Sequence, residues 1–105
     1  MIYLVIIEKF TPEGKKNLKK IREWQKELDD WLLSHGAKFH SVKHYDTLVG
    51  ESLYETWLEY PNYSALDEDE KKAKEFAQDP EWQKLISQMG IFFERVSSRI
   101  VKEIE

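Results

Sequence analysis

The sequence predicts an α+β fold with a βαββαβ order of elements, in which a four-stranded antiparallel sheet carries helices on one face. Segments rich in β-branched and aromatic residues alternate with two regions of helical periodicity. Two prolines, each preceded by a helix-capping residue, mark expected helix starts. The 105 residues, 41% of them hydrophobic, suffice for one domain over residues 1–105 with a packed core.

The first expected strand covers residues 2–7, a continuous apolar run that suits a strand buried on both faces. Thr11, Pro12 and Glu13 then supply an N-cap, a proline in the first turn and an early acid, so a helix should start there. The apolar residues of this helix recur every three or four positions: Leu18, Ile21, Trp24, Leu28, Trp31 and Leu32. Gly36 marks its end.

The next two strands are expected to form a hairpin. Side chains alternate in the first of them, with one face comprising Phe39, Ser41, Lys43 and Tyr45, and the other Lys38, His40, Val42 and His44. Residues 53–60 form the second strand, after a polar loop. A hairpin centred near Val49 pairs the opposite charges of Lys43 and Glu55, which favours this register.

The second helical region is expected to consist of two helices. Acids precede bases from Asp67 to Lys74, as the helix dipole prefers. Asp79 and Pro80 repeat the cap-and-proline pattern, and proline lacks the backbone N–H that a continuous helix needs, so the region should break there. Gly90 should end the second helix, whose expected inward residues are Trp82, Leu85, Ile86 and Met89. The strand formers from Ile91 onward close the sheet.

This order is the ferredoxin-like plan, which leaves one face of the sheet without helices. The first strand is apolar on both faces, because Tyr3, Val5 and Ile7 alternate with Ile2, Leu4 and Ile6. Since large exposed apolar patches usually mark contacts, we expect a homodimer formed through the sheet. Because the apolar run is continuous, the sequence leaves open which of the two rows faces the helices, and therefore whether Val5 or Leu4 meets the partner.

Three segments carry a resemblance to a known family: Leu53–Tyr60, Tyr63–Leu66, and Asp79–Trp82 ahead of a final hydrophobic strand. Over nearly its whole length the chain resembles the dimeric α/β barrel superfamily, including NIPSNAP-like and antibiotic-biosynthesis-monooxygenase-like small proteins. The resemblance implies two ferredoxin-like subunits with their sheets facing each other. It does not imply one chemistry, since members include cofactor-free oxygenases, haem-degrading enzymes, isomerases and ligand-sensing domains. The asparagine, tryptophan and histidine set often associated with the oxygenases is not matched, because Asn17 and Asn62 both lie outside the expected strands.

Five residues are candidates for a ligand site: His40, His44, Tyr54, Trp57 and Trp24. Histidine titrates near neutral pH and can serve as a general base, while aromatic rings can line a pocket for a flat apolar ligand. The alternative is that the histidines are surface groups and the aromatics are core. His40 and His44 would lie about 13 Å apart on one strand, too far to share a metal ion. No metal site and no cofactor are expected.

Composition excludes several partners. The 16 basic and 20 acidic residues leave a net charge of -4, which disfavours nucleic acid, and residues 53–60 lack the glycine and basic residues of an RNA-recognition strand. The absence of cysteine removes disulfides and thiolate chemistry. No apolar run approaches the ~18 residues of a membrane span, so we expect a cytoplasmic protein without a membrane partner.

The function that these observations favour is a small homodimer that binds a small organic ligand between sheet and helices. A cofactor-free monooxygenase-like or haem-handling enzyme is the alternative, and a structural or sensing dimer a third. An RNA-binding domain is the least favoured. The sequence leaves open whether the protein is an enzyme.

Overall fold

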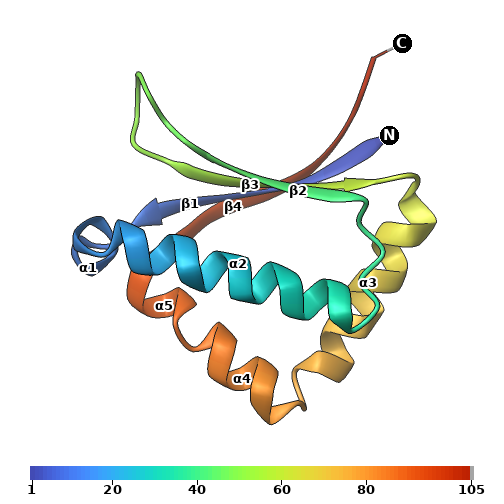
Figure 1. Ribbon diagram of the computed structural model, residues 1–105. Helices are drawn as coiled ribbons and strands as arrows, with labels where there is room; N and C mark the ends of the chain where they lie inside the picture. The colour runs from blue at the N-terminus through green and yellow to red at the C-terminus, as the bar shows by residue number, and fades with distance from the viewer. Residues whose placement is uncertain (105) are drawn as a thin grey trace.

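The computed structural model describes residues 1–104 and confirms the α+β, ferredoxin-like fold (Figure 1). The strands are β1 (Ile2–Phe10), β2 (Ser41–Asp46), β3 (Tyr54–Tyr60) and β4 (Phe93–Lys102). They lie in the order β2-β3-β1-β4, and every neighbouring pair is antiparallel. The most hydrophobic strand, β1, therefore lies inside the sheet, where it is paired on both edges.

All the helices lie on one side of this sheet, and the opposite face is bare (Figure 1). They are α1 (Pro12–Lys16), α2 (Leu18–Ser34), α3 (Tyr63–Phe76), α4 (Pro80–Ile86) and α5 (Met89–Phe92). The β2–β3 hairpin and the C-terminal end of the chain rise on the bare side, at opposite ends of the sheet. None of the helices within residues 1–104 is long and apolar enough to cross a membrane.

The first helical region is two helices, whereas the sequence predicted one. The predicted start is right, since the Thr11 hydroxyl accepts a hydrogen bond from the Gly14 N–H at 3.0 Å. Asn17 interrupts the helix: its backbone leaves the helical region, and its side chain donates to the carbonyl of Glu13 at 2.7 Å. Asparagine competes in this way with the helix for backbone groups. The end of α2 is close to the prediction, because Gly36 adopts a positive φ of 87°.

The break in the second helical region is confirmed. Helix α3 ends before Asp79, whose carboxylate accepts from the N–H of Glu81 at 2.8 Å and caps α4. The role predicted for Gly90 is wrong, because it lies inside α5 and has no positive φ. Helix α4 ends earlier, where the Ser87 hydroxyl donates to the carbonyl of Lys84 at 2.7 Å and a glycine is not required.

The predicted hairpin register is wrong by two residues. Lys43 pairs with Trp57 rather than Glu55, and the turn is centred near Gly50, whose φ is 113°. Because side chains alternate with period two, this shift leaves every residue of β2 on its predicted face. Phe39 is the exception: it precedes β2 and packs on the helical side, against Tyr60 and Leu66.

The structure also decides which row of β1 meets the helices. Leu4 packs with Leu58 and Val42 toward Leu66 of α3, so the even-numbered row faces the core. Val5 points to the bare face, where it is nonetheless fully buried beside its cross-strand neighbour Trp57.

Helix α4 packs partly on other helices. Leu85 is buried as predicted, but Trp82 and Ile86 are only half-buried. The Trp82 ring lies 5.2 Å from that of Trp31 and 6.0 Å from that of Phe76, so its aromatic neighbours are helical rather than on the sheet.

Candidate functional site

A cavity of about 440 Å³ lies between the sheet and the helices. Its apolar walls come from β1, β3 and helices α2 to α4, and include Leu4, Ile6, Leu58, Leu28, Phe76 and Trp82. A few polar side chains interrupt these walls: Glu8, Gln25, Asp29, Thr56, Asp69, Glu70 and Arg95. A mostly apolar hollow with a few convergent polar groups is the usual form of a small-molecule site, for which volumes of about 300–1,000 Å³ are typical.

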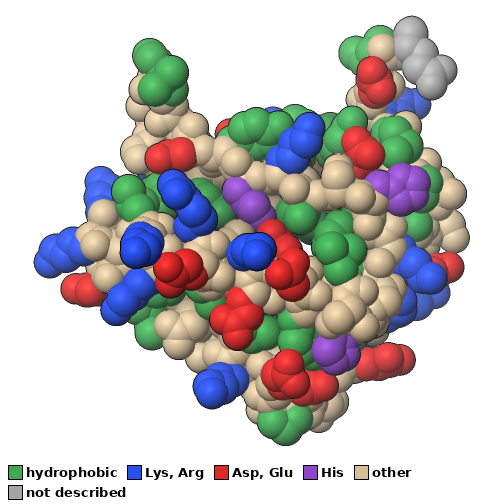
Figure 2. Space-filling model, in the orientation of Figure 1, with side chains coloured by type: hydrophobic (Ala, Val, Ile, Leu, Met, Phe, Trp, Pro, Cys, Tyr) green, Lys and Arg blue, Asp and Glu red, His purple; other side chains and the backbone are tan. Residues whose placement is uncertain are grey.

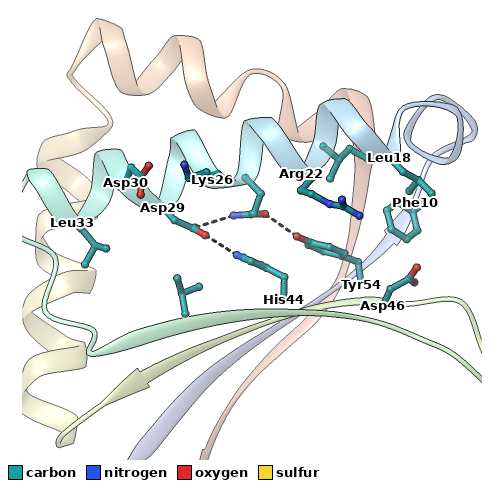
Figure 3. Close-up of a pocket in the computed structure, with 13 residues that line it drawn as sticks. Phe10, Leu18, Arg22, Lys26, Asp29, Asp30, Leu33, His44, Asp46 and Tyr54 are labelled. Atoms are coloured by element: carbon teal, nitrogen blue, oxygen red, sulfur yellow. Dashed lines mark hydrogen bonds and ion pairs between the residues drawn. The ribbon is translucent and has the colours of Figure 1, made fainter.

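A second hollow, of about 490 Å³, runs between α2 and the edge of the sheet formed by β2 and β3 (Figure 3). Phe10 and Leu18 line one part of it, and His44 and Tyr54 project into it from the strands. Gln25 and Asp29 are common to both hollows. The polar wall between them is therefore built from α2, β2 and β3.

This wall is a continuous hydrogen-bonded network (Figure 3). Asp29 accepts from His44 Nε2 at 2.7 Å and from Gln25 Nε2 at 3.0 Å, while the Tyr54 hydroxyl donates to Gln25 Oε1 at 3.2 Å. The other histidine nitrogen, Nδ1, lies 2.9 Å from the Thr56 hydroxyl. Since a carboxylate only accepts, the hydrogen of a neutral His44 is on Nε2, and Nδ1 accepts from Thr56. Both nitrogens of His44 are thus engaged within the protein.

Tyr54 stays a hydrogen-bond donor in this network. Burial raises the pKa of its hydroxyl far above the ordinary value, and the nearby charges of Asp29, Glu8 and Asp46 raise it further. The pKa of Tyr60, at the other end of the cavity, is likewise raised by burial and by its hydrogen bond to Asp69. Both phenols are therefore neutral at physiological pH.

Glu8 is the most unusual residue of the cavity wall. It lies on the core-facing row of β1, and the residue is only 4% exposed. The nearest cationic atom, Arg95 Nε, is 3.8 Å from Glu8 Oε2, which is longer than a hydrogen bond. Burial raises the pKa of the Glu8 carboxyl above its usual range, and the charges of Arg95 and His44 offset part of this rise.

The structure brings together only two of the five predicted ligand residues. The rings of His44 and Tyr54 stack, with centroids 5.7 Å apart and planes at 11°. Trp24 is core, with its indole N–H donating to the Leu85 carbonyl at 2.7 Å. Trp57 lies on the bare face beside Tyr3, because it is three positions after Tyr54 along β3 and side chains on a strand alternate between the two faces.

His40 lies apart from both hollows. It is exposed and precedes the first residue of β2, so the expectation that it shares a strand face with His44 is wrong. Its backbone N–H donates to the carbonyl of Glu59 at 2.8 Å. Within residues 1–104 no three histidine or carboxylate side chains are grouped so that they could hold a metal ion.

Sequence reasoning missed the polar residues that the structure places in the wall, above all Glu8, Gln25 and Asp29. One signal for Glu8 was present, because it continues the row of Leu4 and Ile6 at a spacing of two, so an acid occupies a core-facing position. No comparable signal marked Asp29, since its partner His44 is fifteen residues away on another element.

No model of a known protein family matches the chain, and no curated protein matches it. Solved structures do match. An uncharacterised NIPSNAP domain protein from Burkholderia xenovorans is 18% identical with a TM-score of 0.66, and the match covers 99% of this chain and 95% of that one. A protein from Agrobacterium tumefaciens is 14% identical with a TM-score of 0.70, covering 99% and 94% of the two chains.

A third structure, described as an antibiotic biosynthesis monooxygenase, is 10% identical with a TM-score of 0.63, and both chains are covered completely. Identities this low establish the fold and do not carry residue roles from one protein to another. The chain therefore shares the fold of these NIPSNAP and antibiotic-biosynthesis-monooxygenase structures, and this is the ferredoxin-like fold that the resemblance implied.

Proposed function

We propose that this protein is a homodimer that binds a small, largely apolar organic molecule in the cavity between the sheet and the helices. The observation that supports ligand binding is the cavity of about 440 Å³ itself. A mostly apolar hollow of this size with a few polar groups in its walls is the usual form of a small-molecule site. The rings of Phe39, Phe76 and Trp82 among its walls favour a flat molecule.

The bare sheet face supports the dimer. Its middle is apolar, with the rings of Tyr3 and Trp57 side by side next to the buried Val5. Around them lie side chains of both signs, Lys43, Arg99, Glu55 and Glu59. A surface that carries both positive and negative side chains can pair with a copy of itself about a two-fold axis, because the charges of one copy can lie opposite the complementary charges of the other.

Two projections flank this face and carry exposed apolar side chains. At the tip of the β2–β3 hairpin Leu48 is 97% exposed and Val49 90%, and at the other end of the sheet Ile104 is exposed. The apolar hairpin tip is visible in Figure 2, standing away from the body of the molecule on the bare side. A second copy seated on the sheet would meet both projections and bury side chains that water otherwise surrounds.

A cofactor-free monooxygenase-like enzyme is the second candidate, and the fold shared with the protein described as an antibiotic biosynthesis monooxygenase favours it. A haem-handling enzyme fits less well. His44 is hydrogen-bonded through both ring nitrogens to two residues of the cavity lining, Asp29 and Thr56, so neither nitrogen is free to bind iron.

The ligand is tested by filling the cavity. In Leu58→Trp the introduced indole ring occupies the space where the ligand would lie, while the matched control Ile91→Trp places the same ring at an exposed position of α5. Equilibrium dialysis with naphthalene should show binding to wild type and to the control. We expect the affinity of Leu58→Trp to be at least about tenfold weaker with unchanged circular dichroism. Equal binding of naphthalene by all three proteins, or failure of wild type to bind both naphthalene and its hydroxylated form 2-naphthol, would refute the cavity as the site.

The dimer is tested by sedimentation at micromolar concentration, where wild type should have about twice the mass of the 12.6 kDa chain. Tyr45→Glu places a charge on the bare face at a residue that is already 50% exposed, so a monomer tolerates it. Leu33→Glu is the control, since Leu33 is 49% exposed on α2. Only Tyr45→Glu should weaken the dimer. A monomeric wild type would refute this part of the proposal.

A further inference from the structure

Glu8 lacks the partners that a buried carboxylate ordinarily has. Within residues 1–104 its carboxylate accepts no hydrogen bond, and its one ion-pair contact, with Arg95, is 3.8 Å long. Its cross-strand neighbour Tyr54 directs its hydroxyl to Gln25 instead. The other polar groups of the wall, Asp29 and Thr56, are satisfied by His44. Among the acids that line the cavity, Glu8 is therefore the buried one that accepts no hydrogen bond within the described part of the chain, since Glu70 is exposed.

The ion pair with Arg95 does not account for this burial. The Arg95 side chain is 50% exposed, while that of Glu8 is 6% exposed. The 3.8 Å contact is made through Nε rather than through the two terminal Nη nitrogens of the guanidinium. One terminal nitrogen of Arg95 points to the sulfur of Met89 at 3.9 Å. A buried ion pair offsets its desolvation only with close, hydrogen-bonded geometry, which is missing here. The position of Glu8 thus reduces stability, as is common for groups kept for binding.

We propose that Glu8 is the ligand-recognising group of the cavity, and that the ligand is an apolar ring compound whose polar end is an uncharged hydroxyl donating a hydrogen bond to this carboxylate. The inference rests on the proposed function, because it assigns a residue and a chemical class to the same cavity. Glu8 lies on the wall of the cavity, which the apolar Ile6 also lines. Its carboxylate oxygens accept no hydrogen bond from the described part of the chain, so a donor on the ligand would be their partner.

The charges and the apolar walls of the cavity together favour an uncharged donor. An anionic ligand would meet Glu8 together with Asp29, Asp69 and Glu70, which also line the cavity. A cationic ligand would be attracted by these acids, but it would lose its hydration among mostly apolar walls and would lie close to the guanidinium of Arg95. A neutral hydroxyl avoids both repulsions and supplies the missing donor, and a hydrogen bond to an ionised group is the stronger kind.

The test compares naphthalene, 2-naphthol and 2-naphthoate, which share a ring system and differ in the polar group. Equilibrium dialysis at pH 7.5 should show that wild type binds 2-naphthol at least about tenfold more tightly than naphthalene, the range expected for a hydrogen bond to a charged acceptor. The anion 2-naphthoate should bind most weakly. In Glu8→Met, which keeps the length of the side chain, the affinities for 2-naphthol and naphthalene should agree within about threefold.

Glu94→Met is the matched control, because Glu94 is an exposed acid next to Arg95 on the same strand, and it should keep the wild-type preference. The melting temperature of Glu8→Met should not fall, whereas a merely structural Glu8 would lower it. If Glu8→Met fails to fold, Glu8→Gln replaces it, since the neutral amide also weakens the preference for 2-naphthol.

The outcomes separate the two proposals. If naphthalene and 2-naphthol both fail to bind wild type, the cavity is not the site and the proposed function fails. If both bind with equal affinity, or if the Glu8 variants keep the preference for 2-naphthol, the role of Glu8 is refuted while the cavity remains the binding site.

Discussion

Replacing Asp29 by asparagine tests the network that joins α2 to the edge of the sheet. The carboxylate uses one oxygen for His44 and the other for Gln25. An asparagine has a single acceptor oxygen, so one of the two donors would face its amide group. The variant thus loses one hydrogen bond to a charged group and leaves a donor unpaired in a site where the Asp29 side chain is only 14% exposed.

The expected loss of unfolding free energy is on the order of 2–3 kcal/mol, because hydrogen bonds to charged groups contribute about 1.5–3 kcal/mol and an unpaired buried donor adds to the cost. Urea denaturation followed by circular dichroism measures it. Asp30→Asn is the matched control, since Asp30 is the next residue on α2 and is exposed. It should change stability by less than about 0.5 kcal/mol. Indistinguishable midpoints for the two variants would refute the structural role assigned to the network.

Four further variants test the packing and the buried acid. Leu66→Ala removes a completely buried side chain and should cost about 2–5 kcal/mol in urea denaturation. Gly14→Ala should also destabilise, because its Cβ would collide with the carbonyl of Phe92, whereas Gly90→Ala meets nothing within 4 Å and should stabilise by about 0.5–1 kcal/mol. Burial raises the pKa of Glu8 above 4.5 despite the opposing charges of Arg95 and His44, so the folded state holds this proton to higher pH than the unfolded state. Ionisation of Glu8 therefore lowers stability as pH rises, and the gain in melting temperature of Glu8→Gln over wild type should be largest near pH 7.5 and shrink toward pH 4.5; a gain that grows on acidification would contradict this sign.

The elements that the sequence predicted correctly depend on neighbouring residues. Thr11 and Asp79 each cap a helix within three residues of their own position, and these bonds form in the structure as expected. The continuous apolar run of β1 predicted a strand inside the sheet for a similarly local reason. Where two local signals compete, prediction was less secure: Asn17 lies within a helical pattern, yet its side chain binds the preceding turn and divides the helix.

The facing and register of the strands, and the candidate site, were decided by tertiary structure. Alternation along β1 defines two rows but not which one is covered, and only packing against Leu66 of α3 turns Leu4 inward and Val5 outward. The hairpin register follows from the whole sheet, so the charge pair of Lys43 and Glu55 did not determine it.

The site depended still more on distant segments. Its polar wall joins Asp29 on α2 to His44 on β2 and Thr56 on β3, residues whose spacing along the chain carries no periodic signal. The sequence by itself determined the order of elements and a first strand that is apolar on both faces, because these properties depend on residues that are close together in the sequence. Only the tertiary structure decided that Glu8 is a buried acid beside a cavity, because burial depends on which distant segments cover a residue.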